Sequence, residues 1–536
     1  MSDQPAQPPR PDFVPKPPLL AAAYIFASAF IALSQSLGQG FLSANTQTLG
    51  GELGATQTET MWLMVVFMAP RAVMPLMLIK IRMQFGLRRF AEISIVIYAI
   101  VALISLLAGD LRSALATELL SGISAAPLST LAFLYMLEPL PPEKKLTVGL
   151  PMALTFISLG TPLARAINPL IMFDGSWTNV LMLKLGMSMV CLFLVYRLPL
   201  VSGPTMKVIK GMDLTSFALI AASFSGFVAC FTTGATYWWL QTPWVGQLMA
   251  GSLVALVVAL VIELQRKEPL IDVRWLLSPA MLHLTAALLI FRFILAEQSA
   301  GAPGLFQTLG FSQDQMAPLF WWITLGTFAG GAACALVLRP DRVPMIHIGA
   351  LLLIAAGAGM DAHSNMTVSP RDMFLSQSLI AFASMMFLPS AMANGLLTAL
   401  QKGPTYLLSF IIIFLSSQIL GGTIGAGLFR TFTAARTTAH TEWIKEQLAT
   451  GDPLVSARIA QYMSQLSGSL VDTVQLKTQA VVQLSTVVTR QATVAAYNDV
   501  YTAICFIALA ALAMLLGHLL LNTLRAWMAD PAPAAQ

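Results

Sequence analysis

The chain has 536 residues, of which 57% are hydrophobic and only 10% are charged. A soluble domain carries roughly 25% charged residues, so the composition excludes an ordinary soluble protein, and the high hydrophobicity excludes a disordered chain. Four cysteines are too few for a disulfide-rich secreted scaffold, and the formal net charge of +5 has to be explained by where the basic residues lie.

Residues 1–19 are rich in proline and contain no apolar signal-peptide segment, which predicts a disordered cytoplasmic tail. Long apolar runs then recur, and a helix that crosses a bilayer needs about 20 such residues. The expected fold class is an all-α polytopic membrane protein with a second cytoplasmic tail at 523–536. About fourteen spans are predicted, at 20–44, 60–81, 89–109, 113–137, 147–171, 179–199, 213–236, 245–264, 279–302, 316–337, 344–361, 373–399, 405–431 and 497–522.

Basic residues divide unequally between the two sides of these spans. If both termini are cytoplasmic, the short outer loops receive only Arg112 and Arg371. This positive-inside bias indicates the orientation and explains the net charge without nucleic acid as a partner. The inner side receives the other basic residues of the tails and short loops: Arg10, Lys16, Lys80, Arg82, Arg88, Arg89, Lys144, Lys145, Arg197, Lys207, Lys210, Arg266, Lys267, Arg274, Arg339, Arg342, Lys402 and Arg525.

The segment 433–496 is the one long extramembrane stretch between predicted spans. Gly451, Asp452 and Pro453 predict the end of one helix and the start of the next, with Asp as the N-cap and Pro at the first position. Gly468 predicts a further break. We expect an amphipathic helical hairpin on the outer face. It either caps the last two spans or serves as a docking surface for another protein.

Several short motifs occur in a family-specific order. The longest is Glu-Leu-Gln-Arg-Lys-Glu-Pro-Leu-Ile-Asp-Val-Arg at 263–274, and shorter ones lie at 51–54, 310–312, 420–425 and 497–499. Together they resemble the fourteen-helix drug:proton antiporter group (EmrB/QacA-like) of the major facilitator superfamily.

The resemblance implies a particular domain organisation and function. It implies a six-helix bundle at 20–200, an inserted helix pair at 201–264, and a second bundle at 265–522 that includes the periplasmic hairpin 433–496. Such proteins are multi-pass antiporters of the bacterial inner membrane, which carry out efflux and multidrug resistance by alternating access. Related exporters work with a periplasmic adaptor protein and an outer-membrane channel, and 433–496 is where that contact is expected.

The motifs that carry proton coupling in this group are degenerate here. Gly38 stands where the first span normally has Asp, Glu118 replaces the motif arginine of the fourth span, and Arg165 lies within the altered glycine motif of the fifth. The loop motif between the second and third spans, which is a conformational element of the family, keeps only Gly86, Arg88 and Arg89.

Six ionisable residues fall well inside predicted spans: Arg71, Glu118, Arg165, Lys184, Arg292 and Glu297. Each costs about 2.5–3.5 kcal/mol at a helix centre, so each needs a partner or a wet cavity. Arg71, Arg165, Lys184 and Arg292 are therefore candidates for a cavity that binds an anionic substrate. Glu118 and Glu297 are candidates for proton coupling. A structural alternative stays open, in which Glu118 pairs with Arg165 and Lys184 bonds a carbonyl or snorkels.

The sequence thus predicts an inner-membrane secondary active exporter of amphipathic, anionic small molecules, driven by the proton gradient. It has no catalytic motif and no metal motif, so neither an enzyme nor a cofactor is expected. Two alternatives remain. In the first, the protein no longer carries out antiport and acts as a scaffold or partner of an export complex. In the second, it exports a lipid or a siderophore-like metabolite.

Overall fold

The computed structural model describes residues 15–201, 205, 207–239, 241–266, 269–402, 404–448, 452–468 and 472–529. Within these ranges every regular element is a helix. Residues 1–14 of the predicted tail (Arg10 among them), Lys267, Gly451 and the final part of the second predicted tail lie outside the described residues.

Each of the fourteen predicted spans coincides with helix. Eleven of the described helices are long and apolar enough to cross a membrane, and a bent pair makes up to twelve. The predicted spans 89–109 and 405–431 fall on helices outside that set, α5 (Leu87–Ser105) and α18 (Pro404–Gln447). The all-α polytopic fold class is confirmed, whereas the count of fourteen stays a prediction.

The N-terminal half packs around α1 (Pro18–Ala44), which contacts α6, α8 and α9. Several of its helices begin at side-chain caps that stabilise free backbone N–H groups: Thr56 with Glu59 begins α3, and Asp110 with Ser113 begins α6. Its further elements are α2 (Thr46–Glu52), α3 (Gln57–Val73), α4 (Pro75–Phe85), α5, α6 (Leu111–Leu137), α7 (Pro142–Lys144), the π-helix η1 (Lys145–Gly149), α8 (Leu150–Ile171) and α9 (Thr178–Arg197).

The C-terminal half packs around α17, which contacts α15, α16 and α18, while α16 and α18 also contact α20. Its elements are α12 (Val273–Leu276), α13 (Pro279–Ala296), the π-helix η2 (Glu297–Gly301), α14 (Ala302–Thr308), α15 (Gln313–Val337), η3 (Pro340–Arg342), α16 (Val343–Asp361), η4 (Pro370–Met373), α17 (Phe374–Lys402), α18, α19 (Pro453–Leu466) and α20 (Thr473–Ala529). The two halves meet where α8 lies on α15 and α17 and where α3 and α4 lie on α18.

Between the halves in sequence come α10 (Gly211–Tyr237) and α11 (Pro243–Gln265), which pack on each other. Helix α10 also lies against α3 and α18, one from each half. This placement fits an inserted helix pair, and the domain boundaries at 200, 264 and 522 stay predictions.

The described residues of the stretch 263–274 take part in a cluster of ion pairs at the end of α11. Asp213 at the start of α10 pairs with Lys80 Nζ at 2.8 Å and with Arg266 Nη2 at 2.5 Å, and its side chain is fully buried. Glu263 Oε1 accepts from Arg266 at 2.7 Å, while its Oε2 accepts the backbone N–H groups of Leu270 and Ile271. These contacts join the end of α11 to Leu270 and Ile271, and through Asp213 and Lys80 they connect it to α4 of the N-terminal half.

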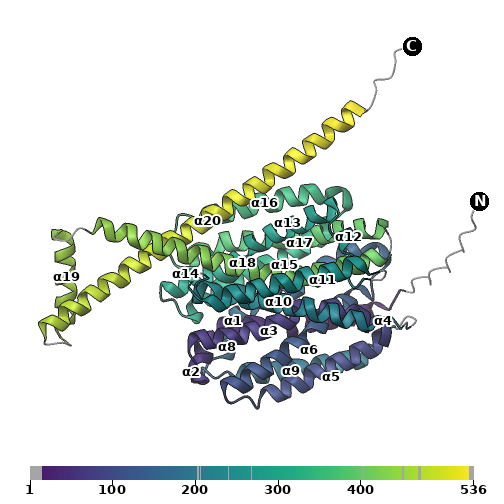
Figure 1. Cartoon of the computed structure of the whole chain (residues 1–536), viewed down its shortest axis with the longest axis horizontal. Coiled ribbons are helices and arrows are strands. Elements are labelled where there is room, and N and C mark those ends of the chain that lie inside the picture. The colour runs from purple at the N-terminus through teal and green to yellow at the C-terminus, as the bar shows by residue number, and fades with distance from the viewer. Residues whose placement is uncertain are drawn as a thin grey trace, which may run out of the picture.

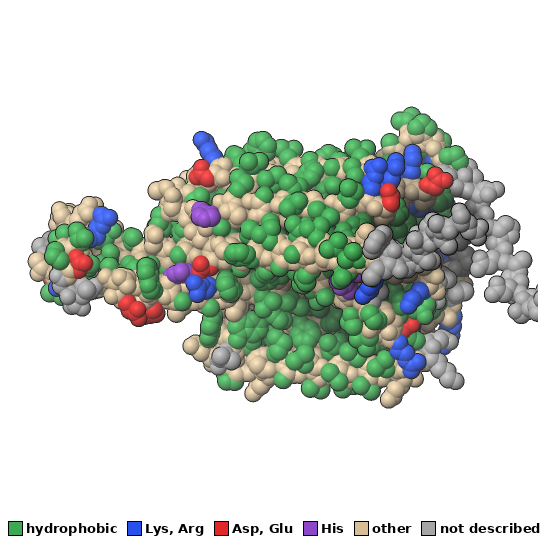
Figure 2. Space-filling model, turned by 90° about the horizontal axis from the view of Figure 1, so that it is seen from above, with side chains coloured by type: hydrophobic (Ala, Val, Ile, Leu, Met, Phe, Trp, Pro, Cys, Tyr) green, Lys and Arg blue, Asp and Glu red, His purple; other side chains and the backbone are tan. Residues whose placement is uncertain are grey.

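Both described ends of the chain lie at the same end of the bundle, the right-hand end of Figure 1. Figure 2 shows an apolar belt across the middle of the molecule, with more Lys and Arg side chains gathered at that end than elsewhere on this face. The arrangement fits an even number of spans and the positive-inside bias. That this end faces the cytoplasm stays a prediction.

A helical projection extends from the opposite end, formed by the last part of α18, by α19 and by the first part of α20 (Figure 1). As the sequence predicts, Asp452 caps α19 and Pro453 is its first residue, and Gly468 lies between α19 and α20. Helices α18 and α20 run without a break from the projection into the bundle, since no Pro or Gly interrupts them at the boundary.

Gly86 of the degenerate loop motif has φ = 83° between α4 and α5. This left-handed conformation favours glycine, because a Cβ atom would be strained there. Arg88 Nε donates to Glu92 Oε1 at 2.8 Å, and Arg89 is exposed. Gly86 lies between the two helices, and Arg88 and Arg89 lie in the first turn of α5. None of the three lines the central cavity described below, and their conformational role stays a prediction.

Candidate functional site

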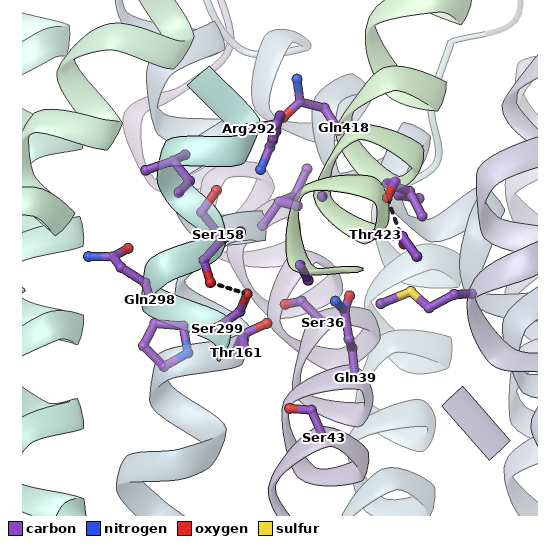
Figure 3. Close-up of a pocket in the computed structure, with 18 of the residues that line it drawn as sticks. Ser36, Gln39, Ser43, Ser158, Thr161, Arg292, Gln298, Ser299, Gln418 and Thr423 are labelled. Carbon is purple, nitrogen blue, oxygen red and sulfur yellow. Dashed lines mark hydrogen bonds between the residues drawn. The ribbon is translucent and has the colours of Figure 1, made fainter. Parts of the chain in front are cut away.

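A central cavity of about 340 Å³ lies between the two halves of the protein. It is lined by α1, α3, α6 and α8 from one half and by α13, α15, α17 and α18 from the other. Figure 3 shows Arg292 and Gln418 at one end of this space, while Ser36, Gln39 and Ser43 follow α1 along it. The volume lies in the range of about 300–1,000 Å³ that is typical of small-molecule sites.

Arg71 enters the cavity where the second predicted span bends. Pro70 lies inside α3 and Pro75 begins α4, and the two helices meet at 50°. A proline removes a helical hydrogen bond, so a bend here follows from the sequence. Arg71 Nη1 donates to Gln39 Oε1 at 2.8 Å and Nη2 donates to Gln35 Oε1, so two neutral amides of α1 hold the guanidinium.

Arg165 lies on α8 at another level of the cavity. Its Nη2 contacts the carbonyl oxygen and the hydroxyl of Ser43 at 3.3 and 3.4 Å, and its guanidinium lies over the Phe320 ring at 5.3 Å. Phe320 belongs to α15, so Arg165 touches both halves of the protein. Such a cation–π contact holds the side chain without neutralising its charge.

Two more arginines complete the lining. Arg292 on α13 packs against Gly421 and Gly425 of α18, which leave room for its side chain and backbone. Arg430 on α18 donates to the Thr232 carbonyl oxygen at 3.3 Å. The sequence analysis missed Arg430 because it falls at the last residues of the predicted span 405–431, where a basic residue is ordinary.

The cavity wall thus carries four arginines, Arg71, Arg165, Arg292 and Arg430, and none of the described residues that line it is Asp or Glu. Several buried nitrogen atoms of these side chains have no hydrogen-bond partner in the described structure: Arg71 Nε, Arg165 Nε and Nη1, and Arg292 Nε. Both amide atoms of Gln418 are also unpartnered. Buried cations without a counter-charge are costly, so the site is electrostatically suited to an anion.

No protein-family model and no curated protein matches the chain. Solved structures do. The human organic anion transporter MFSD10 (TETRAN) aligns with a TM-score of 0.56 over 92% of this chain and 100% of that chain, at 12% identity. An auto-inhibited peptide transporter of the POT family aligns with a TM-score of 0.50 over 91% and 97%, at 14% identity.

Both are transporters of the major facilitator superfamily. This chain has the major facilitator fold. Identities this low show the fold alone, and the narrower resemblance to the drug:proton antiporters is taken up below as a proposal.

Within this major facilitator fold, Lys184 and Glu118 do not line the central cavity. They lie together in a second cavity of about 30 Å³ between α1, α6 and α9. Lys184 Nζ donates to Ser121 Oγ at 2.6 Å and to Ser105 Oγ at 3.4 Å. Lys184, and not Arg165, is the charged neighbour of Glu118, so the pairing considered from the sequence is wrong. Helix α9 packs on α1 and α5 of the N-terminal half. Lys184 therefore points into that half and does not reach the central cavity between the two halves.

Glu297 is also outside the cavity lining, although Ala296 and Gln298 on either side of it belong to that lining. Its side chain is fully buried and turns toward Gln377 of α17 and Asp361 of α16. Sequence reasoning missed Asp361 because it is the last residue of its predicted span, and Gln377 because an uncharged amide gives no signal.

Proposed function

We propose that the protein is a secondary active exporter of amphipathic, anionic small molecules in the bacterial inner membrane. The observation that carries the proposal is the central cavity, where four arginines from both halves face one space and no described lining residue carries a carboxylate. Alternating access moves a site of this kind from one side of the membrane to the other by rocking the two halves. Arg165 touches both halves, so a bound anion would respond to that motion.

The chemistry of the lining supports an amphiphile over a simple inorganic anion. Met64, Met68 and Leu388 lie beside the arginines, and apolar atoms make up most of the surface of the cavity. Methionine adapts to ligands of different shape. The fold likeness to a transporter named for organic anions agrees with this substrate class. A scaffold would have no need of unpaired arginines in a cavity.

We further propose that export is driven by the proton gradient, as the resemblance to the EmrB/QacA-like antiporters implies. The buried carboxyl groups Glu118 and Glu297 are the candidates for the coupling group. Neither lines the central cavity. Glu118 lies in the second cavity with Gln35, the partner of Arg71, and Glu297 lies between the lining residues Ala296 and Gln298. Protonation of either acid can therefore alter the packing around the arginines without contact with the substrate.

The test uses purified protein in proteoliposomes and a matched set of amphiphiles. The compounds share one aromatic body and differ only in the head group: carboxylate, carboxamide or trimethylammonium. We expect the carboxylate alone to bind and to be moved when a pH gradient is imposed. A charged hydrogen bond contributes about 1.5–3 kcal/mol, so Arg165→Gln should weaken carboxylate binding by roughly 10–150-fold.

Arg339→Gln is the matched control, because Arg339 is exposed and lies outside the cavity. Preference for the ammonium compound, or equal binding by the Arg165→Gln protein and the control, would contradict the proposed substrate class. A protein that folds but moves none of the three compounds, with or without a pH gradient, would favour the scaffold.

The projection of α18, α19 and α20 is where we propose that a periplasmic adaptor protein and, through it, an outer-membrane channel would be engaged. Large apolar side chains are exposed there, including Trp443, Leu454 and Val474 at 60%, 80% and 72%. Trp443→Glu together with Leu454→Glu should weaken co-purification of such an adaptor while leaving transport by the isolated exporter unchanged.

A further inference from the structure

Two buried acids share one amide group next to the central cavity. Gln377 Nε2 donates to Glu297 Oε1 at 2.6 Å and to Asp361 Oδ2 at 2.8 Å. The side chains come from three elements, η2, α16 and α17, and the residues are 0–3% exposed. Because both oxygens contact the same nitrogen atom, the two carboxyl groups are held within a few ångström of each other.

No basic group neutralises this pair in the described part of the chain. Neither acid forms an ion pair. Tyr501 of α20 lies beside both acids, and a phenol group carries no positive charge. The charged groups on the neighbouring helices do not pair with the two acids. Arg292 and Arg430 line the cavity, and Arg436 and His440 of α18 bond Asp499 of α20 at 2.6 and 2.7 Å. Arg371 is exposed, and Asp372 accepts from Ser369.

Two buried acceptor atoms of this cluster, Glu297 Oε2 and Gln377 Oε1, have no hydrogen bond of good geometry among the described residues, and the Tyr501 hydroxyl lies beside Glu297. All three side chains have an oxygen that can accept a hydrogen bond, and the Tyr501 hydroxyl can also donate one. The donors beside the two acids are the Gln377 amide and the hydroxyl of Tyr501, both neutral. Two negative charges buried with so few donors would carry a large desolvation cost. The site lacks a positive charge and has oxygen atoms placed to receive one.

The pair lies between the cavity and the surface. On one side, Glu297 begins the π-helix η2, and the next residue, Gln298, lines the cavity and donates to the Gln377 carbonyl oxygen at 3.3 Å. On the other side, Asp361 ends α16 and is followed within two residues by exposed His363. A π-helical turn inside a longer helix often marks a functional site; here it turns Glu297 away from the cavity toward α16 and α17.

We propose that Glu297 and Asp361 form one binding site for a single proton. One acid carries an O–H group while the other is a carboxylate, so the pair has a charge of −1. Binding transfers the proton from a hydronium ion in water to a carboxylate oxygen, and release reverses that transfer. As the coupling site of the proposed exporter, a role that rests on the proposed function, Asp361 is the acid nearer the surface and Glu297 the acid nearer the substrate.

The site can be tested without transport, by infrared spectroscopy of the purified full-length protein. A protonated carboxyl group has a C=O stretching band that is distinct from the carboxylate bands and shifts in heavy water. We expect such a band at neutral pH. In the pair, the charge of one acid opposes ionisation of the other. Asp361→Asn removes that repulsion, so the remaining band should disappear at a pH lower by about one unit or more than in the wild type.

Asp314→Asn is the control, because Asp314 is an exposed acid outside the cluster, and the titration of this variant should match the wild type. If Asp361→Asn does not fold, isotope labelling answers the question in the wild type. Carboxyl ¹³C on all aspartates should shift the band in part or wholly if Asp361 shares the proton. A labelled protein whose band does not move would overturn sharing.

Absence of any protonated-carboxyl band from about pH 5 to pH 9 would overturn the proposal. So would a band that sodium chloride removes and choline chloride does not, since this would assign the site to Na⁺. The result is independent of the proposed function. If the band titrates as expected but the protein moves no anion, the proton site stands and the proposed exporter is rejected. If the protein moves anions but shows no such band, only the proton site is rejected.

Discussion

The cluster of ion pairs around Asp213 allows a quantitative prediction, because one substitution removes the negative charge shared by Lys80 and Arg266. Asp213→Asn keeps the shape of the side chain and removes the charge that holds Lys80 at 2.8 Å and Arg266 at 2.5 Å. Removing one partner of a buried pair costs about 3–5 kcal/mol. Arg266 keeps Glu263 at 2.7 Å, so the unpaired cation is mainly Lys80, whose side chain is 15% exposed. We therefore expect the lower end of that range, about 3 kcal/mol of lost stability.

The double variant Asp213→Asn with Lys80→Gln identifies the cause. If the lost stability comes from the unpaired charge of Lys80, replacing Lys80 as well should restore about 1–2 kcal/mol relative to the single variant. The assay is denaturant unfolding of the purified full chain in one detergent, with Asp314→Asn as the surface control. Unfolding of Asp213→Asn that matches the control, or a double variant less stable than the single one, would refute the electrostatic account of the 263–274 motif.

Three further predictions concern helix contacts. A Cβ atom on Gly331 would lie 1.8 Å from Thr155 Oγ1 across the α8–α15 contact. Gly331→Ala should therefore lower the free energy of unfolding by about 1–3 kcal/mol in the same assay. An unchanged unfolding midpoint would show that the contact is loosely packed. Asn168 and Asn45 exchange amide hydrogen bonds at 2.7 and 3.1 Å. Asn168→Leu should cost about 1–3 kcal/mol in the same assay, because the buried Asn45 Oδ1 loses its donor. Asn168→Asp should also destabilise the protein, because a carboxylate cannot donate to that oxygen, and an unchanged midpoint in both variants would contradict the importance of the pairing. Lys184→Met should reduce expression of folded protein, measured by gel filtration in detergent, because it leaves a buried acid without its cation; folding at the wild-type level would show that the acid is neutral.

The sequence was sufficient to locate the helices because lipid imposes a local rule. A span needs a continuous apolar run, and every predicted span coincides with helix in the structure. The start of α19 at Asp452 and Pro453 was also predictable, since an N-cap and a first-turn proline act within a few residues. The continuity of α18 and α20 into the projection was not, because length and hydropathy mark where a span ends and not where a helix ends.

The scarcity of charge in this chain determined, from the sequence alone, which residues needed explanation. It did not determine their partners. Arg71, Arg165 and Arg292 meet in one cavity, whereas Lys184 lies with Glu118 in another. Glu297 finds its acidic neighbour 64 residues further along the chain, at Asp361. Such pairings depend on which faces of distant helices meet. Helix packing decides this, and the contacts between helices far apart in the chain produce no periodic pattern in the sequence.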